Sequence, residues 1–186
     1  MSDRCQTPAG VVVFALIVLS AGLGATTLLP ADLGELSRDA RAIIRGEVVA
    51  LDPAWTADHR AIETLVTLRG EANLKGGLGP TVQFRIPGGR LGRFQSIMIG
   101  APQFAVGQRV IVFLGARGPG VPYVLGLSQG VFRLVSNGAG WLVTPPGVVA
   151  AGHEGPVVRG DRSRRPMALA DFERQVRLLA SAGAVR

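Results

Sequence analysis

Residues 100–135 read GAPQFAVGQRVIVFLGARGPGVPYVLGLSQGVFRLV and hold the pattern that decides the fold. Residues 107–114 form the most apolar run of this stretch, and Gly and Pro residues separate it from residues 122–127 and 131–135. Short apolar runs bounded by turn-forming residues are typical of β-strands. The stretch therefore predicts three strands of a mainly β protein.

The same pattern continues toward the N-terminus. Residues 62–71 alternate, with Ile62, Thr64, Val66 and Leu68 on one face, which is typical of a half-buried strand. We expect further strands at residues 42–51, 81–86, 94–99 and 141–144. Asp52-Pro53 is a turn signal, so the strands on either side of residues 53–60 form a predicted hairpin. Seven or eight short strands at this spacing predict a small, mostly antiparallel β-barrel.

Helical patterns flank the predicted strands. Residues 31–41 and residues 167–182 place apolar side chains at helical spacing, which predicts an amphipathic helix at each end. Between the last strand and the second helix, residues 145–166 are rich in Gly, Pro and Arg and predict a flexible linker. The expected organisation is a barrel domain over residues 31–144, the linker, and a terminal helix packed on the barrel.

The N-terminus has the composition of a secretory signal peptide, predicted over residues 1–25. Arg4 precedes the apolar residues 11–19, and residues 20–26 are mostly small, with several pairs that suit cleavage. The alternative is a retained membrane anchor, because residues 10–29 contain no charge. We expect an exported protein, periplasmic or secreted. Cys5 would leave with the signal, so the mature domain would have no disulfide.

Composition limits the class of partner. The 186 residues suit one domain, and the net charge is +7. The arginines are spread one per segment, without the clustered basic and aromatic residues of a nucleic-acid interface, so no specific nucleic-acid partner is expected. The expected partner is an unknown protein or envelope component. Membrane contact is expected only if the N-terminal segment is retained, and the oligomeric state is left open.

One catalytic signature occurs, at Gly126-Leu127-Ser128-Gln129-Gly130. A G-x-S-x-G elbow needs a strand before the serine and a helix after it, but the following VFRLV is strand-like. His153 is the one histidine downstream, and no carboxylate precedes it after Ser128. We therefore expect Ser128 in a turn and no catalytic residue, with a serine hydrolase using Ser128 as the alternative.

No metal or cofactor site is expected. His59 and His153 are far apart in sequence, and neither belongs to an H-E-x-x-H pair. The Gly-rich segments lack the P-loop and dinucleotide-binding patterns, so their glycines are interpreted as turns and bulges.

The best binding candidate is the loop at residues 87–94. It combines Arg90 and Arg93 with Leu91 and Phe94, a pair expected to be exposed, on a glycine-rich segment. Loops often carry binding residues, and the alternative is a solvated hairpin connection.

Five stretches carry a family resemblance over about residues 42–135: AIIRGEVVALDPAW, LVTLRGEANLKG, TVQFRIPGG, GAPQFAVGQRVIVFLG and YVLGLSQGVFRL. They resemble an uncharacterised family of exported bacterial proteins and the netrin-like OB-fold barrel of the tissue inhibitors of metalloproteinases. The shared positions are those of G-x-V, L-K-G and F-x-x-G-x-x-x-x-x-F-L motifs: Gly46, Val48, Lys75, Gly76, Phe104, Gly107, Phe113 and Leu114.

The resemblance implies an OB-like barrel, since these motifs are structural. The inhibitors use an N-terminal cysteine to bind the protease zinc and disulfides to brace the barrel, and this chain has neither. Their inhibitory mechanism is therefore not carried over. The expected function is an exported, non-enzymatic binding module, and the alternative is an accessory partner or regulator of a secreted protease.

Overall fold

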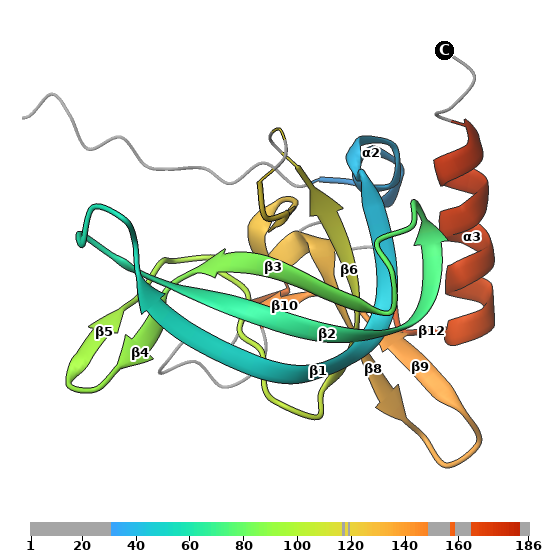
Figure 1. The fold of residues 1–186 in the computed structure, drawn as a ribbon. Coiled ribbons are helices and arrows are strands. Elements are labelled where there is room, and N and C mark those ends of the chain that lie inside the picture. Colours follow the sequence, from blue (N-terminus) through green and yellow to red (C-terminus); the bar gives the residue numbers. More distant parts are fainter. Residues whose placement is uncertain (1–30, 117, 119, 149–156, 159–164, 183–186) are drawn as a thin grey trace, which may run out of the picture.

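The protein is mainly β, with a helix at each end of the part of the chain that the structure places (Figure 1). The structure, a computed structural model, describes residues 31–116, 118, 120–148, 157–158 and 165–182. The predicted signal peptide and His153 lie outside these residues. The elements are α2 (Leu33–Asp39), β1 (Ala42–Trp55), β2 (Ile62–Lys75), β3 (Thr81–Pro87), β4 (Gly89–Leu91), β5 (Phe94–Ser96), β6 (Arg109–Gly115), β7 (Tyr123–Val124), the 3₁₀ turn η1 (Leu127–Gly130), β8 (Val131–Ser136), β9 (Trp141–Thr144), β10 (Gly147–Val148), β11 (Val157–Val158), β12 (Met167–Ala168) and α3 (Leu169–Ala182).

The main sheet curls back on itself. β1 pairs with β2 along its whole length and also with β6 through residues 42–47. From β2 the pairing runs through β3 and β7 to β6, and β8, β9 and β12 extend the sheet beyond β6. All pairs are antiparallel except the single contact of Arg85 in β3 with Tyr123 in β7. The predicted mainly β class, with mostly antiparallel strands, is confirmed.

We call the closed part of the sheet, formed by β1, β2, β3, β7 and β6, the barrel, and β1 and β2 are long enough to bend around it. Register shifts interrupt their pairing at three places, and such bulges bend strands and increase their twist. A methyl group at Gly46 would lie 2.3 Å from the Arg69 carbonyl oxygen, so a glycine is required where the two backbones approach.

The predicted turn at Asp52-Pro53 is wrong, although the hairpin itself is confirmed. β1 continues to Trp55, and the chain reverses between Thr56 and Ala61, where the Thr56 N–H donates to the Ala61 carbonyl. β1 pairs with β6 only as far as Glu47, so within the described ranges Pro53 is paired on one side alone, with Thr64 of β2. A proline is tolerated at such an edge because it removes no ladder hydrogen bond.

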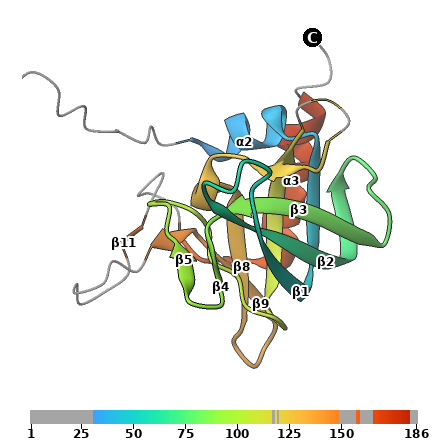
Figure 2. The same ribbon diagram turned by 60° about the vertical axis from the view of Figure 1, so that its left-hand side comes forward.

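β6 separates two apolar cores. Val110, Val112 and Leu114 point into the barrel, where they pack with Ile44, Phe84 and their neighbours. Ile111 and Phe113 point outward and pack with Phe132, Phe172 and Val176 under the two helices. Figure 2 shows α2 and α3 together on this side of the barrel. Burial on both faces explains the uninterrupted apolar run of β6.

The helices are held to the barrel by polar contacts as well. Asp32 and Glu35 form a capping box that starts α2, which confirms the first predicted helix. Lys75 Nζ donates to the carbonyl oxygens of Ser37 and Arg38, both at 2.8 Å, and so satisfies the end of α2. Arg45 in β1 pairs with Glu173 in α3 at 2.9 Å.

The chain after β9 adds short strands and the second helix. Residues 145–166 include β10 and β11, which pair with each other, so the linker prediction missed this ladder. β12 then pairs with β9 and leads directly into α3, the predicted terminal helix. None of the helices in the described ranges is long and apolar enough to cross a membrane.

Candidate binding surface at the hairpin end of the barrel

A small hairpin, β4–β5, stands at the end of the barrel opposite α3 (Figure 1). Leu91 pairs with Phe94, so the hairpin turns through Gly92 and Arg93, and Gly92 supplies the positive φ of 59° at the first turn position. Two sequence predictions change here. Residues 87–91 were interpreted as a turn, but residues 89–91 form strand β4. The strand predicted at 94–99 stops at Ser96.

The hairpin is fixed to the barrel through β2. The buried Thr64 hydroxyl donates to the Gly88 carbonyl oxygen at 2.7 Å. A methyl group at Gly89 would lie 2.5 Å from the same hydroxyl oxygen, so the hairpin lies directly against β2. β4 and β5 therefore hold their surface residues on a backbone that packs against β2.

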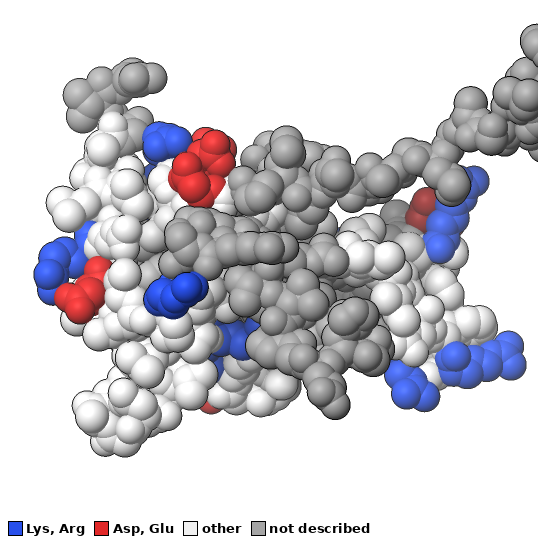
Figure 3. Space-filling view, turned by 180° about the vertical axis from the view of Figure 1, so that it is seen from behind, with Lys and Arg blue, Asp and Glu red and all other residues white. Residues whose placement is uncertain are grey.

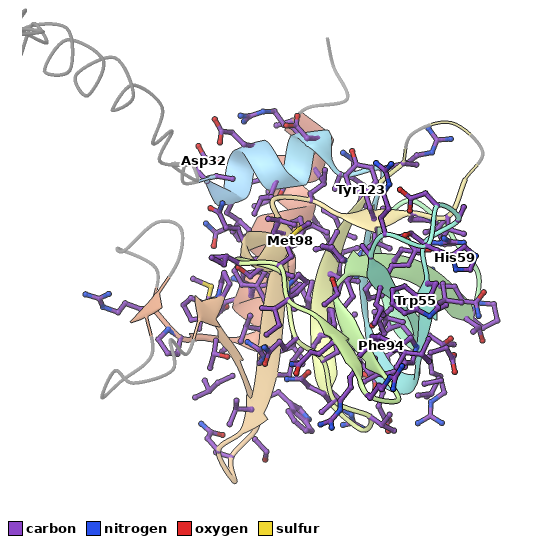
Figure 4. The ribbon with its side chains drawn as sticks, turned by 90° about the vertical axis from the view of Figure 1, so that its left-hand side faces the viewer. Asp32, Trp55, His59, Phe94, Met98 and Tyr123 are labelled. Carbon is purple, nitrogen blue, oxygen red and sulfur yellow. The ribbon has the colours of Figure 1, made fainter. Side chains whose placement is uncertain are left out.

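Three rings gather between the hairpin and the β1–β2 turn. Trp55 meets Phe94 edge to face with ring centroids 5.4 Å apart, and His59 lies 6.5 Å from Trp55. The Arg93 guanidinium lies 5.0 Å from the centre of the Phe94 ring. Figure 4 looks onto this end of the molecule and shows the three labelled rings together.

The β1–β2 turn is ordered by its own side chains. The Thr56 hydroxyl donates to the Asp58 carboxylate at 2.6 Å, and the Arg60 N–H donates to the same carboxylate. These two hydrogen bonds lower the pKa of Asp58 below its usual value. His59 has a φ of 55°, an uncommon conformation for a residue other than glycine. The hydrogen bonds of the turn therefore restrain the backbone that carries the His59 side chain.

Three large apolar side chains in a row are exposed after β5. Ile97, Met98 and Ile99 are 77%, 50% and 83% exposed, and Phe94 is 47% exposed. The backbone of this segment is anchored, because the Ala101 N–H donates to the Met98 carbonyl and the Ser128 N–H donates to the Gly100 carbonyl. Contiguous exposed apolar side chains on a soluble surface mark interaction sites.

A groove of about 300 Å³ runs between the hairpin and the segment that follows it. Its barrel side is apolar and includes Leu51, Ile86 and Phe104, which pack on the inner core. Its outer side includes Ile97, Met98 and Arg90. The exposed apolar residues therefore adjoin a concave surface.

The charge at this end is mixed but includes two available arginines. In the part of the chain that is described, neither Arg90 nor Arg93 pairs with a carboxylate. By contrast, Glu63 is paired with Arg85, and Asp58 accepts hydrogen bonds within its own turn. Figure 3 shows basic side chains standing out from this end of the molecule. We call Trp55, His59, Arg90, Leu91, Arg93, Phe94, Ile97, Met98 and Ile99 the hairpin-end surface.

Ser128 lies in a different setting. It is 6% exposed and belongs to η1, which leads into strand β8 and not into a helix. Its hydroxyl makes no hydrogen bond within the described ranges. A methyl group at Gly130 would lie 2.2 Å from the Leu125 carbonyl oxygen, so this glycine of the G-x-S-x-G motif is required by a close backbone contact.

His59, the histidine that lies in the described ranges, is in the β1–β2 turn at the hairpin end of the barrel.

The structure brings together all four residues of the predicted binding loop, Arg90, Leu91, Arg93 and Phe94, on one hairpin. The sequence prediction missed Trp55 and residues 97–99. A signal for the latter was present, since three consecutive large apolar residues do not alternate as a half-buried strand would. Among the residues that have described positions, no group of three or more His, Cys, Asp or Glu side chains could hold a metal ion. Comparison of the chain with known protein families and with curated proteins finds no match.

Proposed function

We propose that this protein is an exported, non-enzymatic binding module that holds a protein ligand at the hairpin-end surface. The observation that carries the proposal is the run Ile97, Met98 and Ile99, exposed beside an apolar groove. Exposing these side chains to water is unfavourable, by about 25 cal/mol for each Å² of apolar surface. A surface that retains such a run on an anchored backbone is suited to a partner that covers it.

We also propose that the closed part of the sheet is an OB-like, netrin-like barrel. Support comes from the order of strands around it, β1, β2, β3, β7, β6 and back to β1. Five-stranded barrels of this class bind ligands on the face of their second and third strands and on the adjoining loops. In this chain, Thr64 of β2, Ile86 of β3 and the β1–β2 turn lie in or beside the proposed site.

The test is a comparison of two variants in ligand capture. Ile97→Ser combined with Ile99→Ser removes the apolar run, and Leu178→Ser removes a side chain on α3 that is 65% exposed. Proteins captured from the exported fraction by the wild type are identified, purified and titrated against all three proteins. We expect direct binding to the wild type and to Leu178→Ser, with at least tenfold weaker binding to the double variant. Equal affinity for all three would refute the surface.

The identity of the captured protein and two further assays distinguish between the alternative functions. A secreted protease whose activity changes on binding would make the chain a protease regulator. Labelling by a fluorophosphonate probe that disappears in Ser128→Ala would instead make it a serine hydrolase. Mass spectrometry of the N-terminus of the mature protein tests export, because a cleaved signal would leave a chain that begins near residues 20–26.

A further inference from the structure

We propose that the groove binds an extended segment of a partner protein in which large apolar residues alternate with acidic residues. The inference rests on the proposed function and specifies its ligand. Arg90, on the groove wall, would pair with one carboxylate of the segment, and the apolar side chains would enter the groove.

The shape of the site favours a peptide over a large cofactor or a membrane. A volume of about 300 Å³ lies at the lower end of the range of small-molecule pockets, about 300–1,000 Å³. Such a groove has room for a few side chains. Ile97 and Met98 line it, so part of the exposed apolar run faces a concavity and not a protruding tip that could enter a bilayer.

The arrangement of apolar and charged groups favours an alternating ligand. Leu51, Ile86 and Phe104 make the inner wall apolar, while Arg90 of the hairpin strand β4 lines the outer wall. Successive side chains of an extended segment point to opposite sides. A segment lying along the groove would therefore present every second side chain to the apolar wall and the intervening ones to the rim.

The arginines of the hairpin determine the sign of the charge that the ligand should carry. In the ranges that the structure describes, neither Arg90 nor Arg93 has an ion-pair partner, and Arg93 lies over the Phe94 ring. A guanidinium binds carboxylates through paired hydrogen bonds, which are stronger than neutral ones. The net charge of +7 also attracts an acidic segment from a distance. An acidic rim on the ligand is thus complementary to this surface.

The test uses fluorescein-labelled decapeptides and the full mature chain. The first peptide alternates Leu with Glu, the second has Ser in place of Leu, and the third has Lys in place of Glu. We expect the Leu/Glu peptide to bind at least tenfold more tightly than the other two by fluorescence polarisation. Arg90→Glu should reduce that affinity by about tenfold or more, equivalent to about 1.4 kcal/mol. Arg41→Glu is the matched control, since Arg41 is also exposed and lies beside α2 at the opposite end of β1, and it should change the affinity less than twofold.

Each other outcome overturns the inference. Equal binding of the Ser/Glu peptide would mean a general attraction between charges, and equal binding of the Leu/Lys peptide would remove the role of Arg90. A third arm uses vesicles containing anionic lipid. Vesicle binding that Ile97→Ser abolishes, without peptide binding, would assign the surface to membranes. Absence of peptide binding together with a captured protein that still needs residues 97 and 99 would refute the alternating ligand and leave the proposed function standing.

Discussion

Gly130 and Ser128 of the G-x-S-x-G motif provide a stability test in which the two substitutions have opposite expected signs. Gly130→Ala would place a methyl carbon 2.2 Å from the carbonyl oxygen of Leu125, whereas real contacts of this kind do not fall below 3.0 Å. The two atoms must separate by about 0.8 Å. Neither side can yield easily, because the Leu125 N–H donates to the Phe113 carbonyl of β6 and Gly130 leads directly into β8.

The expected cost follows from this contact. Overpacking a well-packed interior costs about 1–3 kcal/mol. A clash with backbone belongs at the upper end, so we expect Gly130→Ala to lower the free energy of unfolding by about 3 kcal/mol. Ser128→Ala removes a buried hydroxyl that has no hydrogen-bond partner among the described atoms. Because an unsatisfied buried polar group is itself unfavourable, we expect that free energy to be unchanged or to rise by up to about 1 kcal/mol.

The measurement is urea unfolding followed by circular dichroism, with thermal unfolding as a second readout. For a chain of this size the loss in Gly130→Ala corresponds to a Tm lower by about 6–12 °C. Gly77→Ala is the control, because a methyl group there meets nothing within 4 Å. If Gly130→Ala were no more costly than Gly77→Ala, the close backbone contact would be refuted. A Ser128→Ala variant that unfolds much more easily would show that the hydroxyl is hydrogen-bonded.

Three further variants test the helices and the β1–β2 turn. Lys75→Met leaves the Ser37 and Arg38 carbonyls without their charged donor and should lower stability to urea by about 1.5–3 kcal/mol; an unchanged midpoint would mean that water replaces the lysine. Phe172→Ala should cost about 3–5 kcal/mol in the same assay, because the side chain is 5% exposed and its ring lies 4.8 Å from that of Phe132; a loss below 1 kcal/mol would argue against a packed α3. Thr56→Val should raise the pKa of Asp58 toward 3.8, as read from an NMR titration of the carboxyl carbon. The lowered folded pKa makes this carboxylate stabilising above its unfolded pKa, and the contribution is lost as pH falls through the folded pKa, so an unchanged titration in Thr56→Val would refute the cause.

Strands that are buried on one face alone were predictable from the sequence. Residues 62–69 alternate in the sequence and alternate in burial, because one side of β2 faces the inner core. β6 was also predicted as a strand. The cause of its continuous apolar run was not predicted, since such a run does not reveal a second core on the outer face. That core depends on Phe172 and Val176, which follow β6 in the chain by about 60 residues. Periodicity within one segment contains no information on such distant packing.

The candidate site was predicted only in part for a related reason. The glycines and arginines at 87–94 mark a hairpin and its charges locally. Trp55 joins the site because β1 runs past Pro53, where it stays paired with β2 after its pairing with β6 has ended. The exposure of residues 97–99 depends on anchoring to η1 through Ser128 and Gly100, which are distant in the chain. Contacts of this kind are set by the tertiary fold.

The two-faced burial of β6 also has a consequence for the newly made chain. Ile111, Phe113 and Phe132 form an outer wall that α3 covers, and α3 follows every strand of that wall in the sequence. During synthesis the barrel strands emerge first, with this wall open to other chains. Partly folded chains with exposed apolar strands aggregate readily. A holding chaperone should therefore protect the protein most until residues 169–182 have emerged, and a chain truncated before Leu169 should depend on it permanently.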